Sequence, residues 1–304
     1  MTRTGWERAL WLAGWLLLAT MAVHVAALVV TGGAVTGPVS LRKPATFAET
    51  SWLLCWSVAL VLPWLRLGRT RRAVVSVAVL AFGIGETSIM AVQAWRGVPS
   101  HYNFTTTFDA VLMRGGAGGL AFVLLAGLVV LLSGVRRSGA PPSVRLGVVA
   151  GTLLLMVGCA VGFVMISNMS GVFDGGFATA FTRPQVGYLG PSAGTVGHEY
   201  VLLRPHTDGG DLVLLHAIGV HGLVLLTLPA LALTRSRRPE PARLLLVTTL
   251  TALVGVGFAG LAVQAFAQQP WDRLSPVALG ALGLVAVGYT ATLARSLQVS
   301  AQTG

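Results

Sequence analysis

The chain has 304 residues, of which 54% are apolar and only 10% are charged, and its mean hydropathy is +0.77. Soluble domains carry about 25% charged residues, so this composition excludes an ordinary soluble fold and indicates an integral membrane protein. The net charge of +11 would suit nucleic-acid binding, but the cations lie in short loops beside apolar segments, where membrane topology and anionic headgroups explain them first, so we expect no nucleic-acid partner.

Eight apolar segments are each long enough to cross a hydrocarbon core of about 30 Å as a helix. Lipid admits only helices or closed barrels, and these segments lack the alternation of barrel strands. We therefore predict an all-α fold, a polytopic membrane helix bundle of about eight transmembrane helices that forms a single integral membrane domain over residues 1–304. The predicted spans are residues 8–30, 51–67, 73–95, 117–135, 145–168, 212–233, 244–267 and 275–294.

The cations are distributed unequally between the two sides of this predicted bundle. If the N-terminus is cytoplasmic, 14 of the 21 Lys and Arg residues lie in inner segments and 7 in outer segments. When Asp and Glu are included, the inner segments carry +12 and the outer segments carry no net charge, and Glu86 lies within a span. By the positive-inside rule, we predict a multi-pass protein of the plasma (inner) membrane with both termini cytoplasmic and the lipid bilayer as its partner.

The segments predicted to lie outside are longer than those predicted to lie inside. Residues 31–50, 96–116 and 169–211 are outer segments, and the last has more than 40 residues. Loops of that length without secondary structure are usually functional or mobile, so we expect residues 169–211 to fold over the outer mouth of the bundle. In the second outer segment, apolar positions at helical spacing predict a short interfacial or re-entrant helix over residues 108–113.

Ionisable side chains within the spans form the candidate site, because a charge in the hydrocarbon core is costly and is usually functional. At about 1.5 Å per residue, His24 and His216 lie roughly 8–9 Å below the outer ends of their spans. Glu86 and His221 lie roughly 13–15 Å deep. We therefore predict that His24 meets His216 and that Glu86 meets His221. We expect His101, in the second outer segment, to cover the site from above.

Two kinds of chemistry fit such a site. Imidazoles at matched depth on facing helices are suited to bind haem or a transition metal, with His24 and His216 as the metal ligands and Glu86 as a third ligand or orienting group. His216 and His221 are about 140° apart around a helix, which favours a different neighbour for each. Burial favours the neutral form of a carboxyl, so Glu86 also suits a proton relay. Gln93 completes the set of candidate site residues.

The sequence is compatible with three functions, and it does not show whether the protein is an enzyme. The favoured one is a haem- or metal-binding membrane protein in a redox or cofactor-handling role, although the cofactor itself is unknown. The second is a proton-coupled small-molecule transporter, which would more often show inverted repeats or interrupted helices, and neither is evident in the sequence. The third is a structural or assembly role, in which the polar groups only join helices by hydrogen bonds.

Several motifs resemble those of an uncharacterised family of polytopic bacterial membrane proteins. The most specific is the run Arg-Gly-Val-Pro-Ser-His at residues 96–101, and the others are Lys-Pro-Ala-Thr-Phe at 43–47 and the paired histidines of 216–221. The family typically has a second Lys where Thr46 stands and a Gln where Val224 stands. The resemblance covers roughly residues 31–115 and 208–225, and it implies a polar site formed by these motifs without implying an activity.

The chain also resembles haem A synthase, although in fewer features. These are eight spans, internal termini, a large outer loop and the run Val-Thr-Gly-Gly at residues 30–33. That family has His pairs in the even-numbered helices of both halves, so the resemblance implies haem chemistry at such pairs. The second, fourth and eighth predicted spans of this chain contain no His.

Overall fold

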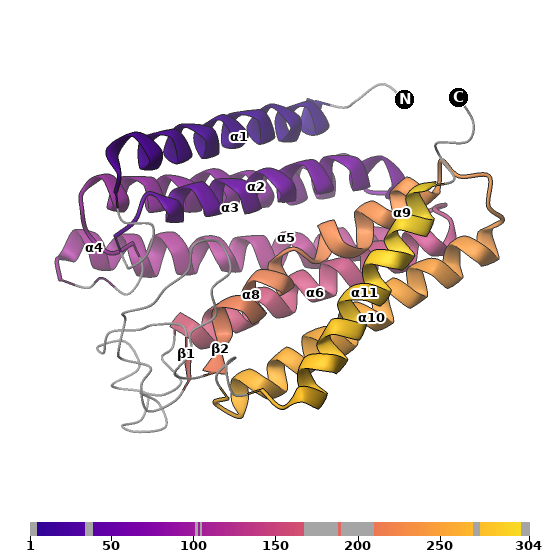
Figure 1. Ribbon diagram of the computed structural model, residues 1–304. Coiled ribbons are helices and arrows are strands. Elements are labelled where there is room, and N and C mark those ends of the chain that lie inside the picture. Colours follow the sequence, from indigo (N-terminus) through magenta and orange to yellow (C-terminus); the bar gives the residue numbers. More distant parts are fainter. Residues whose placement is uncertain are drawn as a thin grey trace.

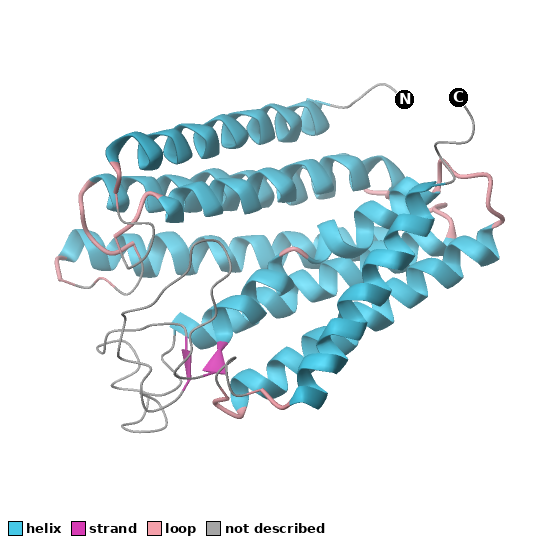
Figure 2. Ribbon diagram, in the orientation of Figure 1, coloured by secondary structure: helices cyan, strands magenta, loops and turns pink. Residues whose placement is uncertain are grey.

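A computed structural model describes residues 5–33, 39–100, 103, 105–166, 188–189, 210–269 and 274–298. The long helices are α1 (Gly5–Thr31), α2 (Arg42–Val61), α3 (Arg69–Trp95), α5 (Gly119–Val135), α6 (Pro142–Ile166), α10 (Glu240–Phe266) and α11 (Pro276–Gln298). The shorter elements are the 3-10 helix η1 (Leu62–Trp64), α4 (Thr107–Val111), the π-helices η2 (Leu112–Gly118) and η3 (Leu223–Thr227), α8 (Leu212–Val220), α9 (Leu228–Leu233) and the antiparallel strands β1 (Tyr188–Leu189) and β2 (Gly210–Asp211). The predicted all-α class is therefore confirmed for the described residues (Figures 1 and 2).

Seven helices in this part of the chain are long and apolar enough to cross a membrane. They are α1, α2 with η1, α3, α4 with η2 and α5, α6, α10 and α11. Residues 212–233, which the sequence predicts to be one span, instead form two helical pieces, Leu212–Val220 and Leu223–Leu233, that are bent by 46° at the break between them. An interrupted helix, which the sequence does not make evident, is thus present.

Large apolar side chains cover the outside of the bundle. Exposed examples from five different helices are Leu12, Val77, Phe122, Val256 and Val277. In water such a surface would be strongly unfavourable, whereas lipid tails solvate it at no cost. The surface therefore agrees with the composition in indicating a membrane environment.

The helices form two groups that lie side by side (Figure 1). One group contains α1, α2, α3 and α5, in which α2 packs on both α1 and α3, and α3 packs on α5. The other contains α6, α8 to α9, α10 and α11, in which α6 packs on α8 and α10 packs on α11. Contacts of α5 with α6 and of α2 with η3 join the groups. The largest apolar core crosses this junction, with fully buried leucines at its centre: Leu10, Leu62, Leu124, Leu128 and Leu131.

The broken span is held against α6 by direct contact between backbones. A Cβ atom added to Gly158 would lie 2.5 Å from the carbonyl carbon of Gly219, and one added to Gly151 would lie 2.8 Å from the carbonyl oxygen of Gly222. Small residues allow this approach in membrane helices, where apolar burial contributes little to helix association. The close approach fixes the rotation of α8 and hence the directions in which its histidines point.

Two of the predicted outer segments are shorter than the sequence predicts. Helix α2 begins at Arg42 and not near residue 51, so it includes two turns that contain charged residues. The helix predicted over residues 108–113 exists as α4, but it continues through η2 into α5 and is neither separate nor re-entrant. Of the outer segment 169–211, only Tyr188–Leu189 and Gly210–Asp211 lie within the described residues.

Candidate functional site

The three described histidines share one feature, a hydrogen bond between the ring Nδ1 and a backbone carbonyl. A carbonyl oxygen can only accept, so Nδ1 carries a proton in each ring and Nε2 is an acceptor whenever the ring is neutral. The group that lies beside Nε2 therefore determines whether each ring accepts a hydrogen bond, binds a proton or is available to a ligand. The Nδ1 to oxygen distances are 2.8 Å for His24 to Thr20, 2.8 Å for His216 to Gly158 and 2.7 Å for His221 to Ala217.

His24 and His216 have different partners, and the described contacts do not pair them as the sequence predicts. The Nε2 atom of buried His24 accepts a hydrogen bond from Nε1 of Trp95 at 3.2 Å, so both ring nitrogens are occupied. The ring of His216 lies against α6, where a Cβ atom added to Gly162 would be 3.0 Å from its Cε1. The reason is that α1 packs on α2 and α3, which places Trp95 and not α8 beside His24. The prediction of haem or metal ligation by this pair thus loses its geometric basis.

The partner of His221 is Glu49 of α2, and not Glu86 as predicted. Its Nε2 atom lies 3.4 Å from Oε2 of Glu49, and the two side chains are 25% and 34% exposed. The sequence places Glu49 in an outer segment because a hydropathy window excludes the charged first turns of α2. A signal was nevertheless present, since Glu49, Trp52 and Trp56 follow one another at helical spacing.

The contact between Glu49 and His221 requires a shared proton. Because Nδ1 of His221 already donates to a carbonyl, a neutral ring presents only a lone pair at Nε2. An ionised carboxylate also has only acceptors, so the two atoms attract each other only when one proton lies on one of them. With that proton the pair is neutral overall, and without it the pair has a charge of −1, which is costly at membrane depth.

This pair lies at the break in the 212–233 segment. Helix α8 ends at Val220, His221 and Gly222 form the bend, and η3 then begins at Leu223. The carbonyl of His221 accepts from the backbone N–H of Leu225 at 2.9 Å, which starts the second piece. Interrupted helices in membrane proteins commonly surround binding sites, and π-helical turns are frequent at functional positions.

Glu86 is buried in the same bundle, with 4% of its surface exposed. Its Oε2 atom has no hydrogen-bond partner among the described residues. The adjacent Thr87 donates to Ser51 of α2 at 3.5 Å. Glu86 thus lies in the interior of the bundle beside the contact of α2 with α3, as a buried site requires, and it does not face lipid.

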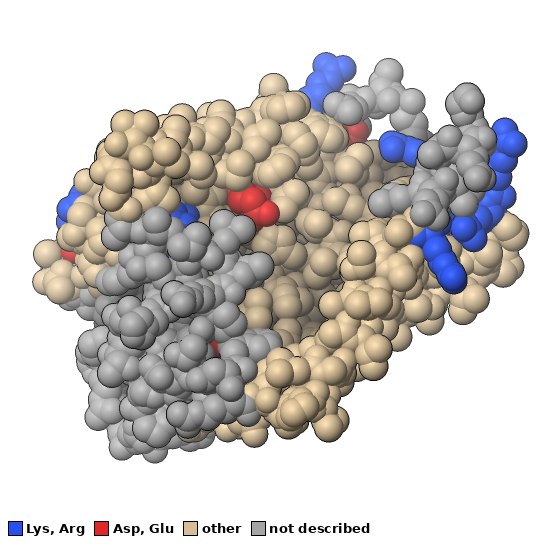
Figure 3. Space-filling view, viewed as in Figure 1, with Lys and Arg blue, Asp and Glu red and all other residues tan. Residues whose placement is uncertain are grey.

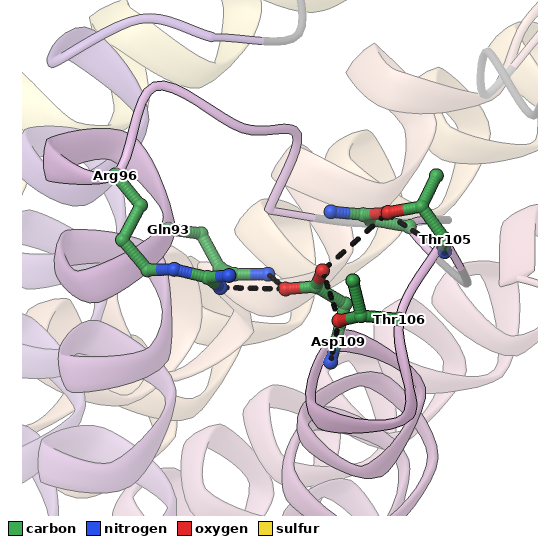
Figure 4. A network of polar contacts seen from close by, with 6 residues as sticks. Gln93, Arg96, Thr105, Thr106 and Asp109 are labelled. Carbon is green, nitrogen blue, oxygen red and sulfur yellow. Dashed lines mark hydrogen bonds and ion pairs between the residues drawn. The ribbon is translucent and has the colours of Figure 1, made fainter.

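Gln93 belongs to a different network, which we name the Asp109 network (Figure 4). Oδ1 of buried Asp109 accepts from Nε2 of Gln93 at 2.8 Å and from Nη1 of Arg96 at 2.6 Å. Oδ2 accepts from the hydroxyl of Thr106 at 2.6 Å, and Thr106 in turn caps α4 by accepting from the N–H of Asp109. The network joins the end of α3 to the start of α4, and it gives Arg96, the first residue of the Arg-Gly-Val-Pro-Ser-His motif, a structural role.

The remaining sequence predictions for the site have less structural support. His101 lies outside the described residues. Within the described residues, no three His, Cys, Asp or Glu side chains come together so that they could hold a metal ion. Two functional candidates, Glu49 and Trp95, were not among the predicted site residues.

Comparison of the chain with protein-family models, with curated proteins and with solved structures finds no match. The geometry of the site therefore carries the functional argument.

Proposed function

We propose that the protein is a proton-coupled small-molecule transporter of the plasma membrane, in which Glu49 and His221 bind the transported proton. One observation carries the proposal: a carboxylate and an imidazole that need one shared proton meet at the break of an interrupted span. Protonation changes the charge of this pair from −1 to zero, and the bend gives the two helical pieces the means to respond. A haem or metal site has no comparable observation in its favour.

The accessibility of the pair supports exchange of this proton. Both side chains keep a quarter to a third of their surface exposed, whereas purely structural polar groups in the bundle, such as Asp109, are fully buried. The contact joins the two helix groups, and Figure 3 shows the molecular surface hollowed between these groups. A path from this hollow to the pair would let protons and a small substrate reach the same place.

We further propose eight spans, with the bent pair counted as one, and both termini on the cytoplasmic side. An even number of crossings is supported by Figure 1, in which α1 begins and α11 ends at the same end of the bundle. Most Lys and Arg side chains on the face in Figure 3 lie at that end. The positive-inside rule assigns this end to the cytoplasm.

Infrared difference spectroscopy of the purified protein in lipid tests the proton-binding step. On raising the pH, we expect one transition in which the carbonyl band of a protonated carboxyl or the bands of a protonated His ring disappear. Glu49→Gln removes the transition while preserving the fold, because the Gln amide can donate the hydrogen bond that His221 needs. The control Glu240→Gln removes a carboxylate that lies beside Arg243, and it leaves the transition in place. A His221 transition that is identical in Glu49→Gln contradicts the proposal.

The variant Glu86→Gln tests whether the carboxyl of Glu86 is needed for proton transport or only for folding. We expect this variant to fold normally, because a neutral amide replaces a buried group without introducing charge. We expect it to abolish proton-driven uptake, measured with a pH-sensitive dye inside proteoliposomes while pools of amino acids, sugars and organic cations are added outside. If no pool of compounds changes the internal pH in proteoliposomes of the unmodified protein, the transporter proposal fails. Proton binding by Glu49 and His221 is then tested by the infrared experiment only.

A further inference from the structure

A pocket of about 340 Å³ lies at the arginine-rich end of the bundle. Three separate segments form it: the turn that follows η1, the first turn of α3 and the residues that follow α5. Nothing in the proposed transport site involves this pocket, which lies at the other end of α3 from Trp95. The lining residues are Arg66, Gly68, Arg69, Thr70, Arg71 and Arg137.

Four exposed arginines thus line one open pocket, and no carboxylate is among the lining residues. Two other arginines at this end of the bundle have acidic partners: Arg72 pairs with Glu7, and Arg243 lies 3.1 Å from Glu240. The positive-inside rule explains a high number of arginines, but it does not explain why four of them line one pocket. Neighbouring like charges raise the potential of the pocket and attract an anion.

The backbone adds further donors to the same pocket. Helix α3 begins at Arg69, its N-cap is Gly68, and neither a side-chain cap nor an acidic residue satisfies its first turn. By contrast, the start of α6 is capped by Glu240, which accepts from the N–H of Ser143 at 2.7 Å. The first N–H groups of a helix favour an anion that can accept several hydrogen bonds at once.

The position of Arg66 is set by the chain around it. A Cβ atom added to Gly139 would lie 3.3 Å from Nη2 of Arg66, so this guanidinium lies along the connection between α5 and α6. A Cβ added to Gly68, in contrast, would meet nothing within 4 Å. The pocket is therefore bordered by an arginine held against a neighbouring loop and is open above the start of α3.

We propose that this pocket binds a phosphate group. Planar guanidinium groups match the oxygens of phosphate in paired hydrogen bonds, which favours phosphate over a simple halide ion. The pocket lies at the ends of three spans, which is the depth of lipid headgroups. The phosphate belongs either to an anionic lipid or to a soluble phosphate compound, and the binding chemistry is the same for both.

The test uses the full chain in dodecylmaltoside with two probes, phosphatidylglycerol in mixed micelles and inorganic pyrophosphate. Phosphatidylcholine serves as the lipid reference. The pocket variant combines Arg71→Gln with Arg137→Gln. The matched control combines Arg136→Gln with Arg145→Gln, which removes two exposed arginines from the same end of the bundle without changing the pocket lining.

We expect the unmodified protein to bind phosphatidylglycerol more tightly than phosphatidylcholine. The affinity should fall about fivefold for each pocket arginine removed, whereas the control should change the affinity less than about twofold. Competition by pyrophosphate assigns the site to soluble phosphate compounds, and binding of the lipid without such competition assigns it to a lipid headgroup. Equal losses in the pocket variant and the control overturn the proposal, because they show general charge attraction only.

A second variant guards against loss of folding. Arg137→Lys keeps the charge but removes the planar fork, so a specific phosphate site loses affinity while general attraction to the membrane does not change. Unchanged lipid affinity in Arg137→Lys, together with an unfolded double variant, also overturns the proposal. The unfolding temperature in phosphatidylcholine alone reports whether each variant is folded.

Discussion

Gly158 of α6 and Gly219 of α8 are in backbone contact, so that a Cβ atom on Gly158 would lie 2.5 Å from the carbonyl carbon of Gly219. The same Gly158 accepts a hydrogen bond from Nδ1 of His216 at 2.8 Å. One position thus fixes both the distance and the rotation of α8. His221 follows His216 by about one and a half helical turns, so the orientation of His221 depends on how α8 is rotated.

Gly158→Ala should therefore destabilise the protein by about 1–3 kcal/mol, the usual cost of inserting a methyl group where no space exists. The matched control is Gly255→Ala in α10, where a Cβ atom would meet nothing within 4 Å. The control should be neutral or stabilising by up to about 1 kcal/mol, because Ala favours a helix more than Gly does. Unfolding temperatures in detergent give the comparison, and equal effects at both positions would contradict the packing seen at Gly158.

The ion pair of Arg96 and Asp109 should contribute to stability as a coupled unit. Asp109 is only 2% exposed in its side chain, and the pair is 2.6 Å apart. A double-mutant cycle with Arg96→Gln and Asp109→Asn should give a coupling energy of at least about 1 kcal/mol, because a hydrogen bond to a buried charge is strong. Arg96→Gln combined with the distant Glu240→Gln should be additive within about 0.5 kcal/mol. Additivity in the first cycle would show that the pair is not coupled.

Trp95→Phe should destabilise the protein by about 1–3 kcal/mol, because it leaves the buried Nε2 of His24 without its donor. Trp15→Phe is the matched control, since Trp15 and Trp95 are similarly exposed, at 57% and 61%. Trp15 contacts Trp56 edge to face, and Phe retains much of that contact. Helix content followed during heating measures both variants. A smaller effect at Trp95 than at Trp15 would argue against the hydrogen bond.

Cysteine labelling on intact cells tests the proposed topology. A membrane-impermeant maleimide should label Ser192→Cys from outside and should label Ser236→Cys only after the membrane is permeabilised. The native Cys55 and Cys159 are buried and should remain unlabelled. Labelling of both introduced cysteines from the same side would exclude the proposed arrangement of spans.

The sequence predicts a depth for each polar group but does not show which neighbour the group meets. The predicted depth follows from counting residues along a helix, whereas neighbours depend on the order in which helices pack. His24 and His216 illustrate this: their predicted depths match, but α1 packs on α2 and α3, and His24 meets Trp95. Glu49 illustrates a second limit, because hydropathy alone ends a helix where charges begin, although α2 continues through them.

The sequence also does not predict the helix break at His221. No proline marks the position, and the two glycines that flank it, Gly219 and Gly222, are of a kind that is common in unbroken membrane helices. At the break, Gly222 lies in close contact with α6, and this contact is a property of the packed bundle. The overall class, by contrast, follows from composition and from the lengths of the apolar segments, which packing does not change.

The location of the break along the span also makes proton binding there sensitive to the membrane potential. Helix α8 has 9 residues, so His221 lies about 14 Å from the start of the span, close to half of a hydrocarbon core of about 30 Å. A proton that reaches Glu49 and His221 from either side therefore crosses about half of the membrane's electric field. A full crossing is equivalent to about 2.3 kcal/mol per 100 mV, so the proton affinity of the pair should change roughly sevenfold for each 100 mV of membrane potential. If the pair binds protons as proposed, voltage as well as pH determines how often the pair is charged.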